Sequence, residues 1–348
     1  MNTRVYKHGG DSGGKKIRLD FSVNVNPMGL PEGVARVLAD SIDSFAAYPD
    51  ITSRELLTAI SKEEGIAAGQ IVLGAGASEL IMAVAHAYAG KRVLLQCPFF
   101  GGYERAFLAA GCELHYADAG EGYQPKSDTA ELIRRYKPDV YVIGNPSNPV
   151  GICPDESIMK ETVSSCAENG SLLLADEVFL GFIGDAKSYT EYFKSGAGIV
   201  SLKAFTKLYS FAGLRLGYAL CSDRELAENI AMQLPEWNIS VPAQVAGVQA
   251  LKEKEYLEDS LSLIGQEREY LSVKLKELGM RVFPSEADFI FFESPVELYV
   301  PLIDKGILIR DCSDHRGIRG QYSCRIAVRK HEDNMQLISE IKEIVNGT

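Results

Sequence analysis

Lys207 and Arg215, which share the segment KAFTKLYSFAGLRLGY (203–218), are the first candidates for chemistry in this sequence. Lys207 lies in a polar turn after an apolar run, and Arg215 follows in a glycine-flanked loop. A lysine amine can serve as a nucleophile, and the planar guanidinium of arginine suits a phosphate group. Because single basic residues at strand ends are usually surface charges, this pair needs support from elsewhere in the chain.

Two further polar segments each follow an apolar run that is typical of a strand. NPSNPVG (145–151) follows DVYVIG, and the acidic pair Asp176 and Glu177 follows SLLLA. Ligands of parallel sheets bind at the carboxyl ends of the strands. We therefore expect these segments to meet Lys207 at one edge of a sheet.

A glycine turn in IVLGAGASELIMAVA joins a predicted strand to a helix that begins near Ser78 and Glu79. Backbone N–H groups at such a helix start form a seat for phosphate. The pattern G-x-G-x-x-E, with no acid about 20 residues further on, argues against a dinucleotide site. A P-loop is excluded because G-x-x-x-x-G-K-[ST] is absent.

The positions of these segments follow from an alternation of elements. From Gln70 to Leu220, short apolar runs alternate with stretches of helical period, which is typical of a mainly parallel sheet covered by helices. After 234–237 (LPEW) a long charged helix, short strands and a last helix predict a smaller α+β unit. We predict an α/β fold with a large domain at 41–236 and a small domain built from 1–40 and 237–348.

Composition excludes several classes of protein. The 348 residues include 36 Lys and Arg against 47 Asp and Glu, a net charge of -11 that disfavours nucleic acids and anionic membranes. No apolar run reaches the roughly 20 residues of a membrane span, and the N-terminus lacks a signal-peptide core. The cysteines form no C-x-x-C pair and the histidines no i, i+4 pair, so we expect no disulfide framework, no metal site and a cytoplasmic location.

Taken together, the motifs resemble the class I/II aminotransferase family, the fold type I enzymes that use pyridoxal 5'-phosphate (PLP). The likeness covers nearly the whole chain and depends most on T-K-x-x-x-x-x-G-L-R-x-G-Y, which follows N-P-x-N-P-x-G and D-E in the family's order. It implies the PLP-dependent transferase fold, PLP as cofactor and an amino acid substrate. The intact set of Lys207, Asp176 and Arg215 argues against a PLP fold that has become a binding or regulatory module.

The resemblance implies roles for residues around the cofactor. Lys207 would form the internal aldimine and later shuttle a proton. Asp176 would face the pyridine nitrogen, and Asn148 would donate to the phenolic oxygen. Phe100 would stack on the ring, with simple core packing as its alternative. Phe179 stands where many aminotransferases have a tyrosine that bonds the cofactor oxygen.

Further residues would bind the phosphate and join two subunits. The phosphate would be held by Ala77, Ser78, Thr206 and Arg215. Tyr48 resembles the tyrosine that reaches the phosphate of a neighbouring subunit, which implies a homodimer with shared active sites.

Substrate recognition is implied by a narrower likeness. HGGD, DFSVNVNPMG, Phe179 and ILIRDCSDHRGIRGQYSCRIAVR are most similar to threonine-phosphate decarboxylases, close relatives of histidinol-phosphate aminotransferases. Arg325 would clamp the substrate carboxylate, and His8 and Asn24 would approach the substrate; for His8 a flexible tail is the alternative.

Two reactions remain open after this likeness. The first is decarboxylation of a small, phosphorylated or unphosphorylated amino acid through an external aldimine. The alternative is transamination of the histidinol-phosphate type. The choice depends on which bond of the substrate stands perpendicular to the cofactor plane, and the sequence does not encode that orientation in readable form.

Overall fold

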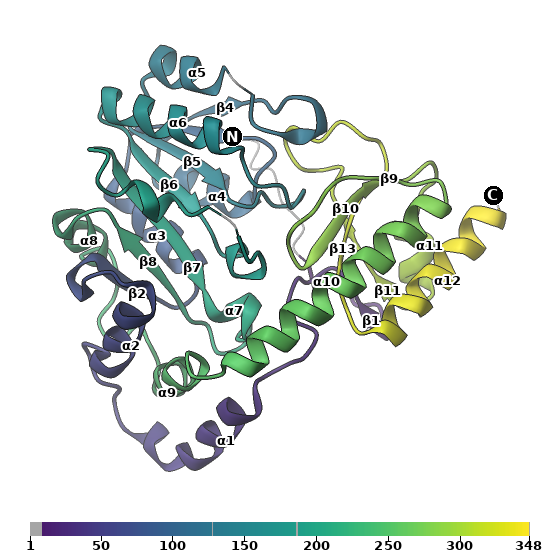
Figure 1. Ribbon diagram of the computed structural model, residues 1–348, viewed down its shortest axis with the longest axis horizontal. Helices are drawn as coiled ribbons and strands as arrows, with labels where there is room; N and C mark the ends of the chain where they lie inside the picture. The colour runs from purple at the N-terminus through teal and green to yellow at the C-terminus, as the bar shows by residue number, and fades with distance from the viewer. Residues whose placement is uncertain (1–8, 127, 186, 348) are drawn as a thin grey trace.

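The large sheet of the computed structural model contains the strands predicted between 70 and 220. The structure describes residues 9–126, 128–185 and 187–347. The strand order is β2-β8-β7-β6-β5-β3-β4, and neighbouring strands are parallel except at β8, which is antiparallel to β2 and β7 (Figure 1). The predicted α/β class and the mainly parallel sheet are confirmed. The strands are β2 (Ile71–Gly74), β3 (Arg92–Gln96), β4 (Glu113–Ala117), β5 (Val140–Gly144), β6 (Leu172–Asp176), β7 (Gly198–Ala204) and β8 (Gly217–Cys221).

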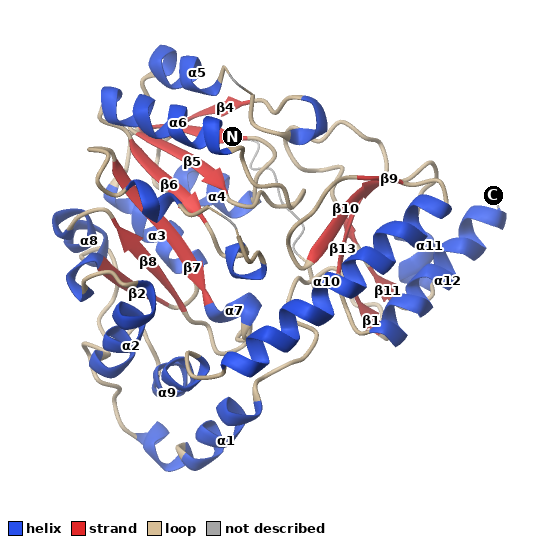
Figure 2. Cartoon of the chain, in the orientation of Figure 1, coloured by secondary structure: helices blue, strands red, loops and turns tan. Residues whose placement is uncertain are grey.

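Helices cover both faces of this sheet, which explains why its central strands are apolar throughout (Figure 2). In β6, Leu172 and Leu174 belong to the core on one face, while Leu173 and Ala175 belong to the core on the other. The first core includes side chains of α3 (Ala77–Ala87), α4 (Gly101–Ala109) and α8 (Arg224–Ala231). The second includes side chains of α5 (Thr129–Tyr136) and α6 (Glu156–Asn169).

A smaller antiparallel sheet lies beside the large one, with strand order β12-β13-β10-β9. Its strands are β9 (Arg281–Val282), β10 (Phe289–Glu293), β12 (Arg310–Asp311) and β13 (Ser323–Ala327). Apolar side chains of α10 (Lys254–Glu277), α11 (Tyr299–Asp304) and α12 (His331–Gly347) form one core with it.

Segments from near both ends of the chain meet in this smaller unit. β1 (Leu19–Asp20) pairs in parallel with β11 (Ile307–Leu308), so that Leu19 lies opposite Ile307. The next helix, α1 (Glu32–Asp40), packs instead on α9 (Val241–Ala250), together with α2 (Arg54–Glu64). The division into 41–236 and 1–40 plus 237–348 stays a prediction.

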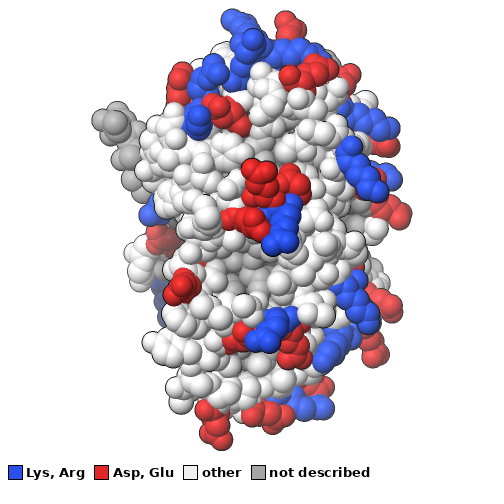
Figure 3. Space-filling model, turned by 90° about the vertical axis from the view of Figure 1, so that its left-hand side faces the viewer, with Lys and Arg blue, Asp and Glu red and all other residues white. Residues whose placement is uncertain are grey.

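The surface charges, the helices and the possible metal ligands can be compared with the classes of protein that the composition argued against. On the face shown in Figure 3, Lys and Arg side chains are interspersed with Asp and Glu. No helix within the described ranges combines the length and the apolar character needed to cross a membrane. No group of three or more His, Cys, Asp or Glu in that part of the chain could hold a metal ion.

Candidate active site

A cavity lies between the large sheet and the small sheet, and the loops after four parallel strands form one of its walls. Phe100 follows β3, Asn148 follows β5 and Phe179 follows β6. Lys207 lies in the short helix α7 (Phe205–Leu208), directly after β7. This is the carboxyl edge where the sequence predicted the site.

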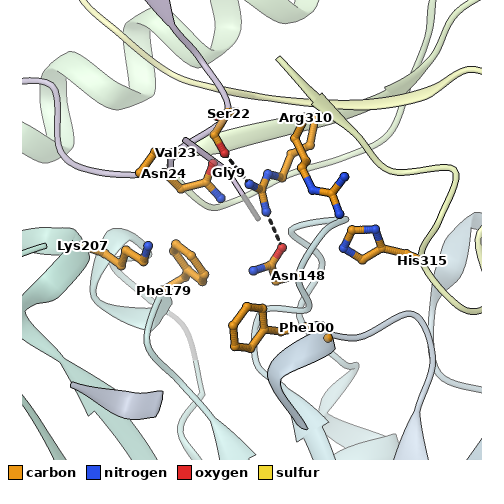
Figure 4. A pocket seen from close by; sticks show the side chains of 12 residues that line it. Gly9, Ser22, Val23, Asn24, Phe100, Asn148, Phe179, Lys207, Arg310 and His315 are labelled. Atoms are coloured by element: carbon orange, nitrogen blue, oxygen red, sulfur yellow. Dashed lines mark hydrogen bonds between the residues drawn. The ribbon is translucent and has the colours of Figure 1, made fainter. Parts of the chain in front are cut away.

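The opposite wall comes from the N-terminal segment and the small sheet. Ser22 and Asn24 follow β1, Arg310 belongs to β12 and Arg325 to β13 (Figure 4). Asn24 is buried, and its Oδ1 has no hydrogen-bond partner among the described residues. A buried acceptor without a partner is costly, so Asn24 is suited to meet a donor in the cavity.

Lys207 is placed to act as a nucleophile. Its Nζ lies 5.7 Å from the centre of the Phe179 ring. Burial lowers the pKa of Lys207, and the positive charges of Arg325 and Arg215 lower it further, against opposing effects of Asp288 and Asp176. A lowered pKa increases the fraction of neutral amine, which is the nucleophilic form.

Asp176, the last residue of β6, is held by two donors. The backbone N–H of Val178 donates to Oδ1 at 3.1 Å, and the Tyr103 hydroxyl donates to Oδ2. Burial raises the pKa of Asp176, and the two hydrogen bonds oppose that shift. Because a carboxylate has about four acceptor sites, Asp176 can still accept a hydrogen bond from a ring N–H.

Asn148 and Arg325, which are 177 positions apart, are directly bonded. The Nη1 of Arg325 donates to Oδ1 of Asn148 at 2.6 Å, and its Nη2 donates to the carbonyl of Ser22 at 2.7 Å. The amide oxygen of Asn148 is therefore engaged, and its NH2 group faces the cavity as a donor (Figure 4). Arg325 has five N–H donors, so it retains donors for a carboxylate.

The start of α3, where the sequence predicts the phosphate seat, is not among the residues that line the cavity. Gly76, just before the helix, has φ of +84°, and a Cβ on it would lie 2.8 Å from Nη2 of Arg215. The exposed guanidinium of Arg215 thus lies against the turn, next to the first residues of α3, Ala77 and Ser78. Thr206, which precedes Lys207, is buried.

These residues fit PLP. An open helix start with an arginine suits the phosphate, a carboxylate with spare acceptor sites suits the ring nitrogen, and a lysine of lowered pKa suits the aldehyde. Phe100 lies on the wall opposite the small sheet, with its ring 5.7 Å from that of Tyr103 in an edge-on contact.

Tyr48, one of the predicted residues, is not among those that line the cavity. It is 83% exposed, and its ring lies 5.2 Å from that of Trp237. His8 lies outside the described residues, although the next residue, Gly9, lines the cavity.

Sequence reasoning missed several residues of the site. Arg310 lines the cavity, and its Nη2 lies 3.0 and 3.1 Å from the two carboxylate oxygens of Asp314. His315, also on the wall, lies 2.9 Å from Asp314 through Nδ1, and burial lowers its pKa. The signal available was the basic cluster in IRDCSDHRGIR, but such a cluster is equally typical of a surface loop. Tyr103 carried no signal beyond being aromatic.

Comparisons with known proteins agree with this geometry. A model of the family "Aminotransferase class I and II" matches residues 16–341. The chain is 28% identical to threonine-phosphate decarboxylase of Salmonella typhimurium over 337 residues, 94% of this chain and 92% of that protein. It is 31% identical to histidinol-phosphate aminotransferase 2 of Archaeoglobus fulgidus over 330 residues, 94% and 93% of the two chains. The solved structure of histidinol-phosphate aminotransferase from Clostridium acetobutylicum superimposes with a TM-score of 0.89 at 27% identity, covering 95% of this chain and 100% of that one.

Proposed function

Because this chain belongs to the class I and II aminotransferase family and is a PLP-dependent enzyme, we propose that it decarboxylates a small phosphorylated amino acid of the threonine-phosphate type. The observation that carries the substrate class is the second guanidinium on the cavity wall. Arg325 suits the carboxylate of an amino acid, and Arg310, fixed by Asp314, suits a second anionic group such as a phosphate. The likeness to threonine-phosphate decarboxylase supports the same choice.

Each of the following residues would have its own role in the proposed reaction. Bound PLP supplies an electron sink for the bond that breaks at the substrate Cα. Lys207 would hold the aldehyde and later carry a proton on Nζ. Asp176 would accept a hydrogen bond from the ring nitrogen, and the Asn148 NH2 group would donate to the phenolic oxygen.

The other predicted residues would bind the phosphate of PLP and the substrate, and would enclose the PLP ring. Ala77, Ser78, Thr206 and Arg215 would hold the phosphate of PLP, and Phe100 would cover one face of the ring and exclude water. Arg325 and Asn24 would orient the substrate, with His8 as a further candidate contact. Their contacts would decide the reaction, because they would set which bond at the substrate Cα is held in position to break.

Transamination is the second candidate, because the likeness to histidinol-phosphate aminotransferase 2 of Archaeoglobus fulgidus also covers 94% of the chain. The deciding experiment mixes the holoenzyme with threonine phosphate alone and follows CO2 and the visible absorbance of the cofactor. We expect CO2 without accumulation of pyridoxamine phosphate. Pyridoxamine phosphate without CO2 would identify an aminotransferase. If neither product forms, threonine phosphate is not the substrate.

We also propose a homodimer with shared active sites. Tyr48 contacts Trp237, and Ile42, Phe45 and Ile51 near it in the sequence are also exposed apolar side chains, a group that favours contact with another subunit. A partner subunit would cover this group and bring Tyr48 to the cofactor phosphate of its neighbour.

We propose a cytoplasmic location, which the free thiols support. Each of the seven cysteines is free, and six of them are buried. Proteins with several unpaired cysteines suit a reducing compartment. The partner that we propose besides a second copy is the small-molecule substrate, and the net charge of -11 argues against a nucleic acid.

A further inference from the structure

The turn at 74–77, between β2 and α3, is held by two side chains that the proposed reaction does not use. Glu79, in the first turn of α3, accepts a hydrogen bond from the backbone N–H of Ala75 at 2.6 Å through Oε2. The same oxygen accepts a hydrogen bond from Nδ2 of Asn238 at 2.9 Å. Glu79 therefore connects the backbone just before the helix to a loop 159 positions further along the chain.

Asn238 also holds the strand that precedes the turn. Its Nδ2 donates to the carbonyl of Leu73 in β2 at 3.1 Å. β2 is an edge strand of the large sheet, so backbone groups on its outer side need partners from outside the sheet. Asn238 lies in the loop before α9, and its one side chain connects this loop to β2 and, through Glu79, to α3.

These hydrogen bonds determine which N–H groups of the turn remain for a ligand. The carboxylate of Glu79 takes the N–H of Ala75, and the N–H of Gly76 donates to the carbonyl of Gly74 at 2.7 Å. The first N–H groups of a helix have no acceptor within the helix. Those of Ala77 and Ser78 are therefore the donors that α3 offers to a phosphate.

Backbone packing also restricts the turn. A Cβ on Gly217 of β8 would lie 3.0 Å from the backbone nitrogen of Ala77 and 3.1 Å from the carbonyl carbon of Gly76. The strand and the turn are therefore in close contact, which only a glycine at position 217 allows. Two kinds of contact fix the turn: its packing against β8 and its hydrogen bond to Glu79.

The charge of Glu79 is unfavourable for an anion site. The helix dipole stabilises a carboxylate at a helix start, but the same carboxylate repels a phosphate that binds there. Any contribution of Glu79 to phosphate binding must therefore come from holding the backbone and not from its charge. A glutamine has a neutral acceptor of the same reach, so it would keep the hydrogen bonds and remove the repulsion.

We propose that Glu79 and Asn238 are positioning residues that hold the turn so that the first N–H groups of α3 converge on the phosphate of PLP. This inference rests on the placement of that phosphate in the proposed function. Glu79 acts directly on the turn, whereas Asn238 acts through Glu79 and Leu73. Loss of either side chain loosens the turn and weakens phosphate binding, and the contacts of the PLP ring remain.

The test compares PLP with pyridoxal, which has the same ring and aldehyde but no phosphate. The apoenzyme is titrated with each compound, and the visible absorbance of the bound compound gives the affinity. In Glu79→Ala we expect PLP affinity to fall about tenfold or more, the effect of one charge-assisted hydrogen bond, and pyridoxal affinity to stay within about twofold. The ratio of the two affinities isolates the phosphate, because a general loss of structure would lower both.

Two further variants separate hydrogen bonding from charge and test the connection to Asn238. Glu79→Gln should bring the ratio back to within about threefold of the wild type. Asn238→Ala should lower the ratio, as Glu79→Ala does. In the double variant Glu79→Ala/Asn238→Ala, the ratio should fall by less than the product of the two single effects, because the two residues share one hydrogen bond.

Asp223→Ala is the matched control for the loss of a carboxylate at a helix start. Asp223 caps α8 by accepting a hydrogen bond from the N–H of Leu226 at 2.8 Å, and it follows the end of β8 that is remote from Gly217. Its loss should lower the free energy of unfolding, as the loss of Glu79 does, and leave the ratio unchanged. If Glu79→Ala does not fold, the ratio in Asn238→Ala still decides.

An unchanged ratio in Glu79→Ala would overturn the inference, whether both affinities fell together or neither fell. A ratio as low in Glu79→Gln as in Glu79→Ala would also contradict it, because the charge and not the hydrogen bonds would then matter. The outcome is independent of the substrate. CO2 release from threonine phosphate with an unchanged ratio would reject only the positioning role, and a lowered ratio without CO2 would reject only the proposed substrate.

Discussion

At the scale of single residues, the site depends on which cations are paired and which are available. Lys203 and Lys207 both belong to the segment around the end of β7, yet their surroundings differ. Lys203 forms an ion pair with Glu64 at 2.6 Å, whereas Lys207 lines the cavity with a lowered pKa. Only the second environment suits a lysine that must react as a neutral amine.

We therefore expect Lys207→Ala to abolish both activity and the borohydride-dependent attachment of PLP to the chain. The reason is that the reducible bond needs the Lys207 amine. Mass spectrometry of the reduced, digested protein checks it. Lys203→Ala is the matched control and should still attach PLP at residue 207. Attachment elsewhere in wild type, or a colourless protein that PLP does not reconstitute, would contradict the assignment.

Residue types alone could not reveal all of this site. The motif around Lys207 and Arg215, together with N-P-x-N-P-x-G and D-E before it, was sufficient to predict the family, because the spacing of the motif is specific. Arg310 lacked any such spacing. It became a candidate only when the fold placed it on the cavity wall.

At the scale of elements, the strand ends and one helix start position the site. Four loops at the carboxyl edge bring together residues from Phe100 to Lys207. This arrangement could be predicted, because alternating apolar runs and helices determine a parallel sheet, and a parallel sheet determines where its loops meet. The hydrogen bond from Arg325 to Asn148 could not be predicted, because it depends on how the small sheet packs against the large one.

The start of α3 offers a test of the phosphate seat. Gly76→Ala should weaken PLP affinity by about tenfold or more, because the new Cβ would displace Arg215 and cost one charge-assisted hydrogen bond, about 1.5–3 kcal/mol. Both backbone strain at φ of +84° and loss of affinity are expected. Equilibrium titration of the apoenzyme with PLP measures the effect.

Gly65→Ala is the control for backbone strain. Gly65, after α2, has φ of +65°, but a Cβ there would meet nothing within 4 Å. Both variants should lose about 1–2 kcal/mol in the free energy of unfolding, and only Gly76→Ala should lose PLP affinity. Equal PLP affinity in the two variants would argue against a phosphate at this turn.

At the scale of the whole molecule, one chain leaves part of the expected site incomplete. The sequence likeness assigns Tyr48 to a cofactor phosphate, yet Tyr48 is 83% exposed, contacts Trp237 and does not line the cavity of its own chain. A second subunit would resolve this difference. Contacts between chains could not be predicted here, because the sequence motifs and the structure each describe one chain.

Mixing two inactive variants tests this arrangement. Lys207→Ala removes the reactive amine, and Tyr48→Ala removes the group that would cross to the neighbour. In a mixed dimer, one site would combine Lys207 of one chain with Tyr48 of the other and would be intact, while the second site would lack both. Random exchange makes half of the dimers mixed, with one working site in each, so activity should return to about a quarter of the wild-type value.

The control mixes Lys207→Ala with Asp176→Asn, because we place both residues on the same chain's side of the cofactor. No mixed dimer of that pair regains a complete site, so its activity should stay at the level of the separate variants. Recovery in the first mixture and not in the second would locate Tyr48 in the neighbour's site. Equal behaviour of the two mixtures, once light scattering has shown dimers and subunit exchange, would mean that Tyr48 does not complete the neighbouring site.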